Sequence, residues 1–408
     1  MKLGTYGRTP ALAAVALSAM VALSGCGAGS SSGSDVGSTG AEAVKGGIPV
    51  GFLNQGQGAA ALPNAGAGAP AAVTYLNAHG GINGKKINLI TCDTDGTPAT
   101  SVACANRFVQ EKVAVVVQGI DLGSDSAVPI LEGAGIPLVG HTGFGPVQSN
   151  SSHAFFFGAA PGAYTAGPAV VVAENMGLKS LAFTNIDAPP ARAYTKIALE
   201  PVVKNLGLDL DVSYYPASAP NYSSVMASLL AKRPDAVLII GPEQVCTGML
   251  QAAKSLGFKG KILAGSCTAF IKADPASAEG AFTASDLYQA GDDTLPADKK
   301  AELAIFDGAM AKNEKYKDGF SQNSFSATMD LATVLKTTNG DYSSTAILEA
   351  LRNVRDMSSF MGQTLNCDGK QWPGEKSVCG AGLIEYEVKD GRLSNFTNGF
   401  VNPSKYLG

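Results

Sequence analysis

Apolar and polar positions along residues 47–264 form blocks that predict strands and helices in turn. Val113 to Val117, for example, is an almost continuous apolar run, typical of a strand buried on both faces of a sheet. The longer blocks carry apolar residues at helical spacing, and several begin near proline or end at glycine. The predicted strands are 48–53, 86–92, 113–117, 137–140, 154–157, 180–184, 210–215, 236–240 and 261–264, and the predicted helices are 65–78, 98–111, 127–131, 164–176, 191–206, 222–232 and 245–256.

Repeated strand–helix units imply parallel sheets covered by helices on both faces, and here the pattern starts again near residue 154. We therefore predict an α/β protein with two doubly wound parallel-sheet lobes, which fits a length of 408 residues. The C-terminal third differs, with predicted helices at 297–312, 324–337 and 344–353. Asp390-Gly391 then separates two alternating runs, which predicts a β-hairpin.

The charge balance argues against a nucleic-acid-binding protein. Lys and Arg number 30 against 34 Asp and Glu, a net charge of −4, whereas nucleic-acid binding requires a basic surface. Hydrophobic residues make up 45% of the chain, which is enough for a large core. Only three histidines are present, which argues against a site built from several histidines.

The N-terminal residues predict the compartment. Lys2 and Arg8 precede an apolar stretch at 11–23, which is too short for a permanent membrane span and fits a signal peptide. Leu23-Ser24-Gly25-Cys26 resembles the bacterial lipobox, so we predict a signal peptide at 1–25, lipidation of Cys26 and a flexible Gly/Ser linker at 26–46. The chain would then be anchored by lipid to the outer face of the bacterial cell membrane. The alternative is an ordinary secretory signal with a chance cysteine.

Six of the seven cysteines remain if Cys26 is lipidated, an even number for an oxidising compartment. Six cysteines allow 15 connectivities, but their clustering favours three local bridges. A zinc site is the alternative, and no CxxC or HxxxH spacing supports it. The three predicted bridges are Cys92–Cys104, Cys246–Cys267 and Cys367–Cys379.

Candidate binding residues come from the loops that follow the predicted strands, because ligands of open parallel sheets lie beyond the carboxyl ends of the strands. These loops offer hydroxyls, amides, carboxylates and backbone N–H groups, which suit a small polar or zwitterionic molecule. For any single residue, turn formation or helix capping is the competing explanation. The candidates are Asn54, Gln57, Asp121, Ser124, His141, Thr142, Gly143, Phe144, Asp187, Glu243, Ser266 and Thr268.

Catalytic motifs are scarce, so we do not expect an enzyme, a cofactor or a metal. The GxSxG match at 29–33 lies in the linker instead of between a strand and a helix. Gly56-Gln57-Gly58 lacks the third glycine of a dinucleotide fingerprint. A Ser124-His141-Asp121 triad is conceivable, but nothing in the spacing supports it.

Residues 76–87, which include Gly80-Gly81-Ile82 and Gly84, resemble a signature of the leucine/isoleucine/valine-binding proteins of ABC importers. The segments 92–107, 115–124, 135–139 and 220–237 resemble further parts of this family in the same order, so that the similarity covers about 47–400. The resemblance implies a type I periplasmic-binding fold, in which two lobes joined by three crossover segments close on a ligand.

The resemblance also implies lobe boundaries. With crossings near 157–158, 266–269 and 361–366, lobe 1 would comprise 47–157 and 271–362, and lobe 2 would comprise 158–270 and 363–408. The second and third crossings would lie close to two of the cysteine pairs, which would stiffen the hinge.

The family's site residues correspond to this chain only in part. Its serine loop corresponds to 121–124, and its carboxylate-holding loop corresponds to 141–143. Its tyrosine-glycine turn is replaced by 187–190, and the acid that pairs with an α-amino group is missing from 265–268. Glu243 or Asp187 could replace that acid, while His141 and Phe144 would suit a larger or planar ligand. An amino acid, an aromatic acid, another small carboxylate and an amide all remain open.

The function that follows is a monomeric solute-binding lipoprotein that delivers a small molecule to an ABC permease and its ATPase subunits. A ligand sensor of the same fold that signals to a partner protein is the alternative. A secreted α/β hydrolase is a third hypothesis, and the missing catalytic motifs argue against it.

Overall fold

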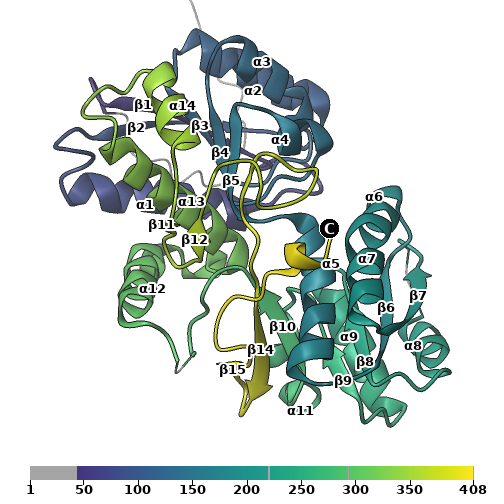
Figure 1. Cartoon of the computed structure of the whole chain (residues 1–408). Coiled ribbons are helices and arrows are strands. Elements are labelled where there is room, and N and C mark those ends of the chain that lie inside the picture. The colour runs from purple at the N-terminus through teal and green to yellow at the C-terminus, as the bar shows by residue number, and fades with distance from the viewer. Residues whose placement is uncertain (1–43, 219–220, 293, 408) are drawn as a thin grey trace, which may run out of the picture. The chain divides into compact units, whose positions relative to one another are not determined.

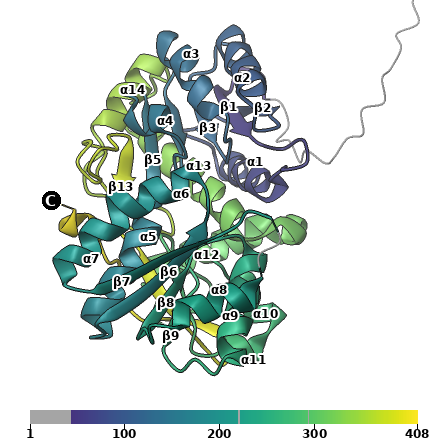
Figure 2. The same cartoon turned by 90° about the vertical axis from the view of Figure 1, so that its right-hand side faces the viewer.

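The computed structural model describes residues 44–218, 221–292 and 294–407, which form two large sheets, each flanked by helices, and one two-stranded sheet (Figures 1 and 2). The predicted α/β class with two parallel-sheet lobes is confirmed. Residues 1–43, and with them the predicted signal peptide and Cys26, lie outside the described residues. Within the described part, no helix has the length and apolar character needed to cross a membrane.

The sheet of lobe 1 has the strand order β13-β5-β4-β3-β1-β2, and all neighbouring strands are parallel. Its strands are β1 (Ile48–Asn54), β2 (Ile87–Asp93), β3 (Val115–Gln118), β4 (Leu138–Gly140), β5 (Ala154–Ala159) and β13 (Val378–Gly380). Its helices are α1 (Pro63–Ala78), α2 (Pro98–Gln110), α3 (Val128–Gly133), α4 (Pro146–Asn150), α12 (Ala297–Met310), α13 (Gly319–Lys336) and α14 (Ser344–Arg352), with the short helices η1 (Ser124–Ser126) and η4 (Ala311–Tyr316). Strands β11 (Met357–Ser358) and β12 (Thr364–Leu365) form a separate small sheet.

The sheet of lobe 2 has the order β15-β14-β10-β9-β8-β6-β7, in which β14 runs antiparallel to both of its neighbours. Its strands are β6 (Ser180–Ile186), β7 (Asp209–Tyr215), β8 (Ala236–Ile239), β9 (Lys261–Leu263), β10 (Phe282–Ser285), β14 (Ile384–Lys389) and β15 (Arg392–Asn395). Its helices are α5 (Pro161–Val170), α6 (Pro189–Tyr194), α7 (Glu200–Leu206), α8 (Tyr222–Leu230), α9 (Glu243–Ser255), α10 (Ala269–Ala273) and α11 (Pro275–Ala278), with the short helices η2 (Val171–Asn175), η3 (Thr195–Leu199) and η5 (Pro403–Tyr406). The predicted hairpin is confirmed, with positive φ at both Asp390 and Gly391 between β14 and β15.

Helix α1 shows how local sequence sets the packing of lobe 1. It starts at Pro63, and proline suits the first helical turn because the N–H groups there have no intrahelical partner. Gly68 faces α13, where an added Cβ would overlap the carbonyl oxygen of Ser321. The absence of a side chain at this position therefore lets the two helices approach closely beside the sheet.

Two of the predicted lobe boundaries are corrected by the strand pairing. Strand β10 pairs with β9 and β14, so 271–285 completes lobe 2 and the second crossing follows Ser285 instead of 266–269. Strand β13 pairs with β5, so the third crossing follows Gly380 instead of 361–366. Both strands have only three or four residues, too few to show a periodicity in the sequence. The first crossing lies between Ala159, where β5 ends, and Pro161, where α5 begins.

All three predicted disulfides are confirmed. The third bridge ends at Cys379, directly beside the third crossing. The second bridge lies in a hydrophobic cluster of lobe 2, where Cys246 and Cys267 are buried. The carbonyl oxygen of Cys267 accepts a hydrogen bond at 2.7 Å from the hydroxyl of Thr283, two residues before the second crossing.

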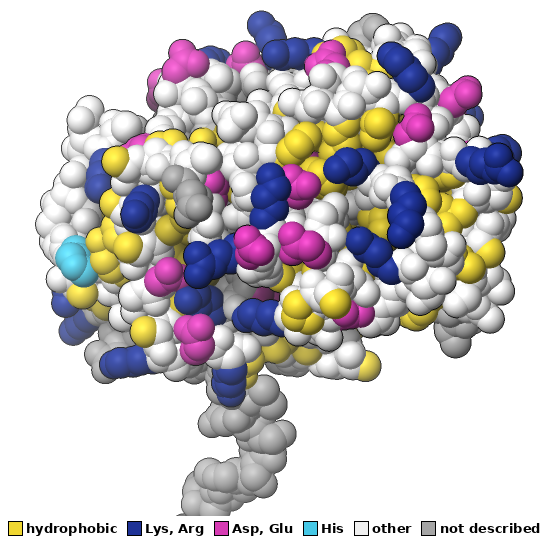
Figure 3. Space-filling model, turned by 90° about the horizontal axis from the view of Figure 1, so that it is seen from below, with side chains coloured by type: hydrophobic (Ala, Val, Ile, Leu, Met, Phe, Trp, Pro, Cys, Tyr) yellow, Lys and Arg dark blue, Asp and Glu magenta, His cyan; other side chains and the backbone are white. Residues whose placement is uncertain are grey.

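The surface seen in Figure 3 carries both signs of charge. Lysines and arginines alternate there with acidic side chains around small apolar areas. This local mixture matches the nearly even counts of 30 basic and 34 acidic residues in the chain.

Candidate functional site

The strand orders locate the candidate site at one edge of each sheet. Strand order reverses between β1 and β3 in lobe 1 and between β6 and β8 in lobe 2. In open α/β sheets, ligands bind beyond the carboxyl ends of the strands at such switch points. The loops that carry the twelve candidate residues follow β1, β3, β4, β6, β8 and β9, at these carboxyl ends.

In lobe 1, the switch point is bridged by buried side chains. Asn54 donates to the carbonyl oxygen of Leu62 at 3.2 Å and accepts from the Ile120 N–H at 3.1 Å, which joins the loops after β1 and β3. Asp121 accepts hydrogen bonds from the hydroxyls of Thr94 at 2.8 Å and Ser101 at 2.6 Å. Both candidates are thus bonded within the lobe and shape the loops.

Ser124 and the loop after β4 lie next to this bridge. The Ser124 hydroxyl donates to the carbonyl oxygen of Asp121 at 2.7 Å. Gly143 is packed on Phe156, whose ring would lie 2.7 Å from an added Cβ. Thr142 is buried, whereas Gln57 is exposed.

Three large apolar side chains remain exposed at this edge of lobe 1. Leu122 is 62% exposed, Phe144 is 41% exposed and Val147 is 43% exposed. Leu122 follows β3, Phe144 follows β4 and Val147 lies in α4, so this edge of lobe 1 offers apolar groups to a ligand or a partner.

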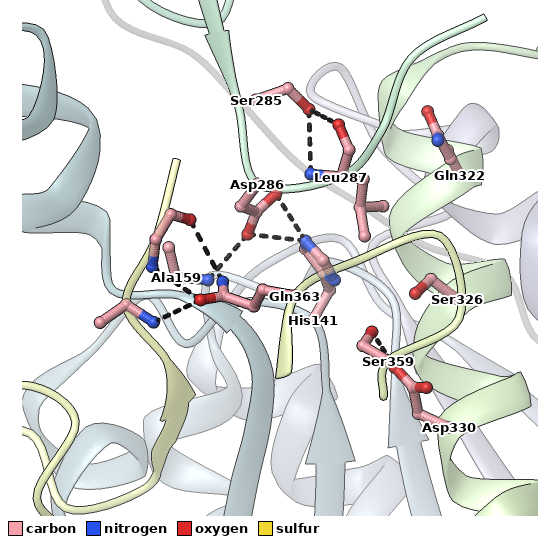
Figure 4. A network of polar contacts seen from close by, with 12 residues as sticks. His141, Ala159, Ser285, Asp286, Leu287, Gln322, Ser326, Asp330, Ser359 and Gln363 are labelled. Carbon is pink, nitrogen blue, oxygen red and sulfur yellow. Dashed lines mark hydrogen bonds and ion pairs between the residues drawn. The ribbon is translucent and has the colours of Figure 1, made fainter. Parts of the chain in front are cut away.

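His141 forms a buried pair with Asp286, which follows β10 (Figure 4). Its Nε2 lies 2.9 Å from both carboxylate oxygens, and the two side chains are only 3% and 2% exposed. Asp286 also accepts from the Ala159 N–H at 2.7 Å. Burial alone would raise the pKa of Asp286, but His141 and the hydrogen bonds from Ala159 and Tyr164 lower it below its usual value. The pair therefore connects the candidate loop after β4 to the first and second crossings.

The side chain of Gln363 is hydrogen-bonded to the backbone at the third crossing. Gln363 accepts from the N–H groups of Ala381 at 3.0 Å and Gly382 at 2.7 Å. On α13, Asp330 accepts from the Ser359 hydroxyl at 2.7 Å, and burial raises the pKa of its carboxyl to about 7 (Figure 4). His141, which the sequence predicts as a ligand-binding residue, is buried here and bonded to Asp286.

In lobe 2, both candidate acids already have partners. Glu243 accepts from the N–H groups of Thr268 at 3.0 Å and 3.1 Å and of Ala269 at 2.9 Å, which caps α10. Asp187 accepts from Nε of Arg192 at 2.8 Å, and this bond lowers the pKa of the Asp187 carboxyl. Ser266 and Thr268 are exposed.

Three residues near the site were not predicted from the sequence. Arg192 lies in α6, just beyond the Pro189-Pro190 departure from the family pattern, and its guanidinium carbon lies 4.1 Å from the centre of the Tyr214 ring. The only sequence signal for it was its position six residues after the end of β6. Asp286 follows β10 and Gln363 precedes β12, and neither of these short strands was predicted from the sequence.

Two surface grooves lie along helices. One, of about 720 Å³, runs along α9 between α8 and α10 and includes Glu243. The other, of about 650 Å³, lies between α13 and α14. Among the described residues, no group of three or more His, Cys, Asp or Glu side chains is placed to hold a metal ion.

Comparisons with known proteins agree with this architecture. The model of the family described as periplasmic binding protein matches residues 47–373. A Pseudomonas aeruginosa amino acid binding protein is 43% identical over 65 residues, a match that covers 16% of this chain and 17% of that protein.

Solved structures show the same fold over nearly the whole length. A leucine binding protein from Thermotoga maritima matches with a TM-score of 0.66 and 18% identity, covering 88% of this chain and 99% of that one. An R. palustris ABC transporter solute binding protein, solved with 4-hydroxybenzoate, also has a TM-score of 0.66 and 18% identity, covering 87% and 96%. These relatives are binding proteins and not enzymes, and they confirm the predicted resemblance. The chain therefore belongs to the periplasmic binding protein family and has its type I, two-lobed fold.

Proposed function

We propose that this protein is the solute-binding component of an ABC importer. It would capture a small carboxylate-bearing or polar molecule between its two lobes and deliver it to a membrane permease with its ATPase subunits. The observation that carries this proposal is the His141–Asp286 pair, which links a loop at the binding edge of lobe 1 to two crossings. Such a link couples a ligand loop to the segments about which two lobes close.

The related proteins support a small organic ligand. One relative is named for amino acids and another was solved with 4-hydroxybenzoate, so both an amino acid and an aromatic acid fit the family. Of the twelve candidate residues, Ser124, Thr142, Gly143 and Phe144 stay in the proposed site on lobe 1, and Asp187 stays on lobe 2. The proposed role requires no catalytic group and no cofactor.

A thermal-shift screen tests the binding function. The full chain, with its disulfides intact, is heated with branched-chain and polar amino acids, aromatic acids, short aliphatic acids and amides. A ligand at 100 times its Kd adds about 2.7 kcal/mol to the free energy of unfolding, which raises the melting temperature measurably. At least one compound should give a saturable shift, and the absence of any shift would contradict the proposal.

The proposed location is the outer face of the bacterial cell membrane, through a lipid on Cys26. The support is the sequence Leu23-Ser24-Gly25-Cys26 and the Gly/Ser linker that follows. Replacing Cys26 with Ser should release the protein from the membrane fraction. Retention of the variant in that fraction would contradict the lipid anchor.

A further inference from the structure

The loop between Cys367 and Cys379 is fixed to lobe 1 at both of its ends. The two cysteines form a disulfide and belong to a hydrophobic cluster of lobe 1. Before the second cysteine, the N–H of Ser377 donates to the carbonyl oxygen of Ser149 in α4 at 3.0 Å, and its hydroxyl lies 2.7 Å from the carbonyl oxygen of Gln148. The ends of this loop therefore move with lobe 1.

The middle of the same loop packs on lobe 2. Trp372 is only 3% exposed and belongs to the hydrophobic cluster that contains the buried residues of α5. Its ring lies 2.8 Å from the point that a Cβ atom would take on Gly162, the second residue of α5. The Cβ of Ala198, in η3, lies 3.0 Å from the same point. The missing side chain of Gly162 therefore makes room for the indole ring against α5.

The loop connects two of the three crossings. Gly162 lies in the first turn of α5, directly after the first crossing, and Cys379 directly precedes the third crossing. Trp372 comes five residues after Cys367, and five residues of extended chain span at most about 17 Å. Because a buried indole ring loses its apolar contacts if it leaves its place, this short segment holds the start of α5 near the bridge.

We propose that residues 368–378 form a strap that holds the first and third crossings together and thereby confines the movement of the two lobes to one hinge. The Cys367–Cys379 bridge anchors the strap in lobe 1, and the Trp372 side chain anchors it in lobe 2. With the strap in place the two crossings move as one unit, and release of Trp372 gives the lobes a wider range of relative orientations. The inference goes beyond the proposed function, and its test needs no ligand.

Two variants release the strap in different ways. Gly162→Ala adds a methyl group where the Trp372 ring lies, and Trp372→Ala removes the anchor itself. Gly167→Ala is the matched control, because it adds a methyl group to the same helix against Leu383, which lies outside the strap. Circular dichroism and the melting temperature establish that each variant is folded.

Two measurements on the unliganded full chain give the outcome. Trp372 is the only tryptophan of the chain, so quenching of its fluorescence by acrylamide reports directly whether its ring is buried. Spin labels at Gln110→Cys in α2 and Ala227→Cys in α8, both exposed, give the distribution of distances between the lobes by pulsed electron paramagnetic resonance. Cys26→Ser removes the one cysteine outside the three bridges, so that only the two introduced thiols are labelled.

The strap predicts opposite results for the variants and the control. Gly162→Ala should raise the quenching constant of Trp372 at least about twofold, because the ring leaves its buried place. Both Gly162→Ala and Trp372→Ala should broaden the distance distribution by about 1.5-fold or more, since more lobe orientations are populated. Gly167→Ala should leave both measurements unchanged.

A distance distribution in Trp372→Ala as narrow as that of the unaltered protein would overturn the inference, and so would equal broadening in Gly167→Ala. Release of the ring in Gly162→Ala without any broadening would overturn it too. If Gly162→Ala keeps the ring shielded from acrylamide, the distribution in Trp372→Ala decides alone. None of these results touches the binding function, which the thermal-shift screen tests separately.

Discussion

Removing the His141 side chain tests the buried pair that links the crossings. In His141→Ala, the Asp286 carboxylate keeps its hydrogen bonds from the Ala159 N–H and from Tyr164 but loses the imidazole 2.9 Å away. Both side chains are at most 3% exposed, so water cannot replace the lost partner without opening the structure.

The expected cost follows from this burial. Breaking a buried pair by removing one partner costs about 3–5 kcal/mol, because the remaining charge stays buried without its charged or polar partner. Asp286→Ala should cost a similar amount, because it leaves the His141 N–H and the Ala159 N–H without an acceptor. The double variant should cost less than the sum of the two by at least about 2 kcal/mol, since each single change removes the same interaction.

Urea unfolding of the four proteins of this cycle, followed by circular dichroism, measures these values. His153→Ala is the matched control, since His153 lies 3.3 Å from Glu132 in a partly exposed pair and should cost less than about 1 kcal/mol. A cost for His141→Ala equal to that of the control, or costs that simply add in the double variant, would refute the reasoning about the buried pair.

Three further changes probe other parts of the fold. Burial raises the pKa of the Asp330 carboxyl from 3.8 to about 7, so the folded chain holds a proton that the unfolded chain releases, and this residue's contribution to stability falls as the pH rises from about 4 to 7. Asp330→Asn should therefore flatten the pH dependence of urea unfolding over that range, and an unchanged dependence would argue against a buried neutral carboxyl. Gly68→Ala should lower the free energy of unfolding by about 1–3 kcal/mol, because the added methyl group meets the backbone of α13, and a neutral effect would contradict that close approach. Joint replacement of Cys92 and Cys104 with Ala should cost about 3 kcal/mol from chain entropy, measurable as a lower melting temperature, and an unchanged value would show that the bridge does not stabilise the fold.

The architecture could be predicted because its signals are local and repeated. Each strand–helix unit leaves apolar runs such as 113–117 in the sequence, and the pairing of neighbouring cysteines needs only short loops. Strand β10 was missed because Phe282–Ser285 is short and mixes apolar with hydroxyl residues. Its place beside β9 depends on contacts far along the chain, and the lobe boundaries shifted with it.

The position of the candidate site could be predicted from the sequence, but which of its side chains are free to bind a ligand could not. The loops at the carboxyl ends follow from strand order, so the positions of Asp121 and Glu243 could be anticipated. Whether these two carboxylates are free to bind a ligand could not be predicted, because the partners of Asp121 come from the loop after β2 and from α2, and those of Glu243 are backbone N–H groups. For the same reason the pair of Arg192 with Tyr214 has no sequence signature, since the two residues meet only after β6 and β7 have paired.

Small-angle X-ray scattering of the full chain, with and without a saturating ligand identified by the thermal-shift screen, tests most directly whether two lobes close on a small molecule. A binding protein of this fold should show a smaller radius of gyration when the ligand is bound, and a compound that gives no thermal shift should leave the radius unchanged. A ligand that saturates the protein in calorimetry and leaves the scattering curve unaltered would contradict capture between closing lobes.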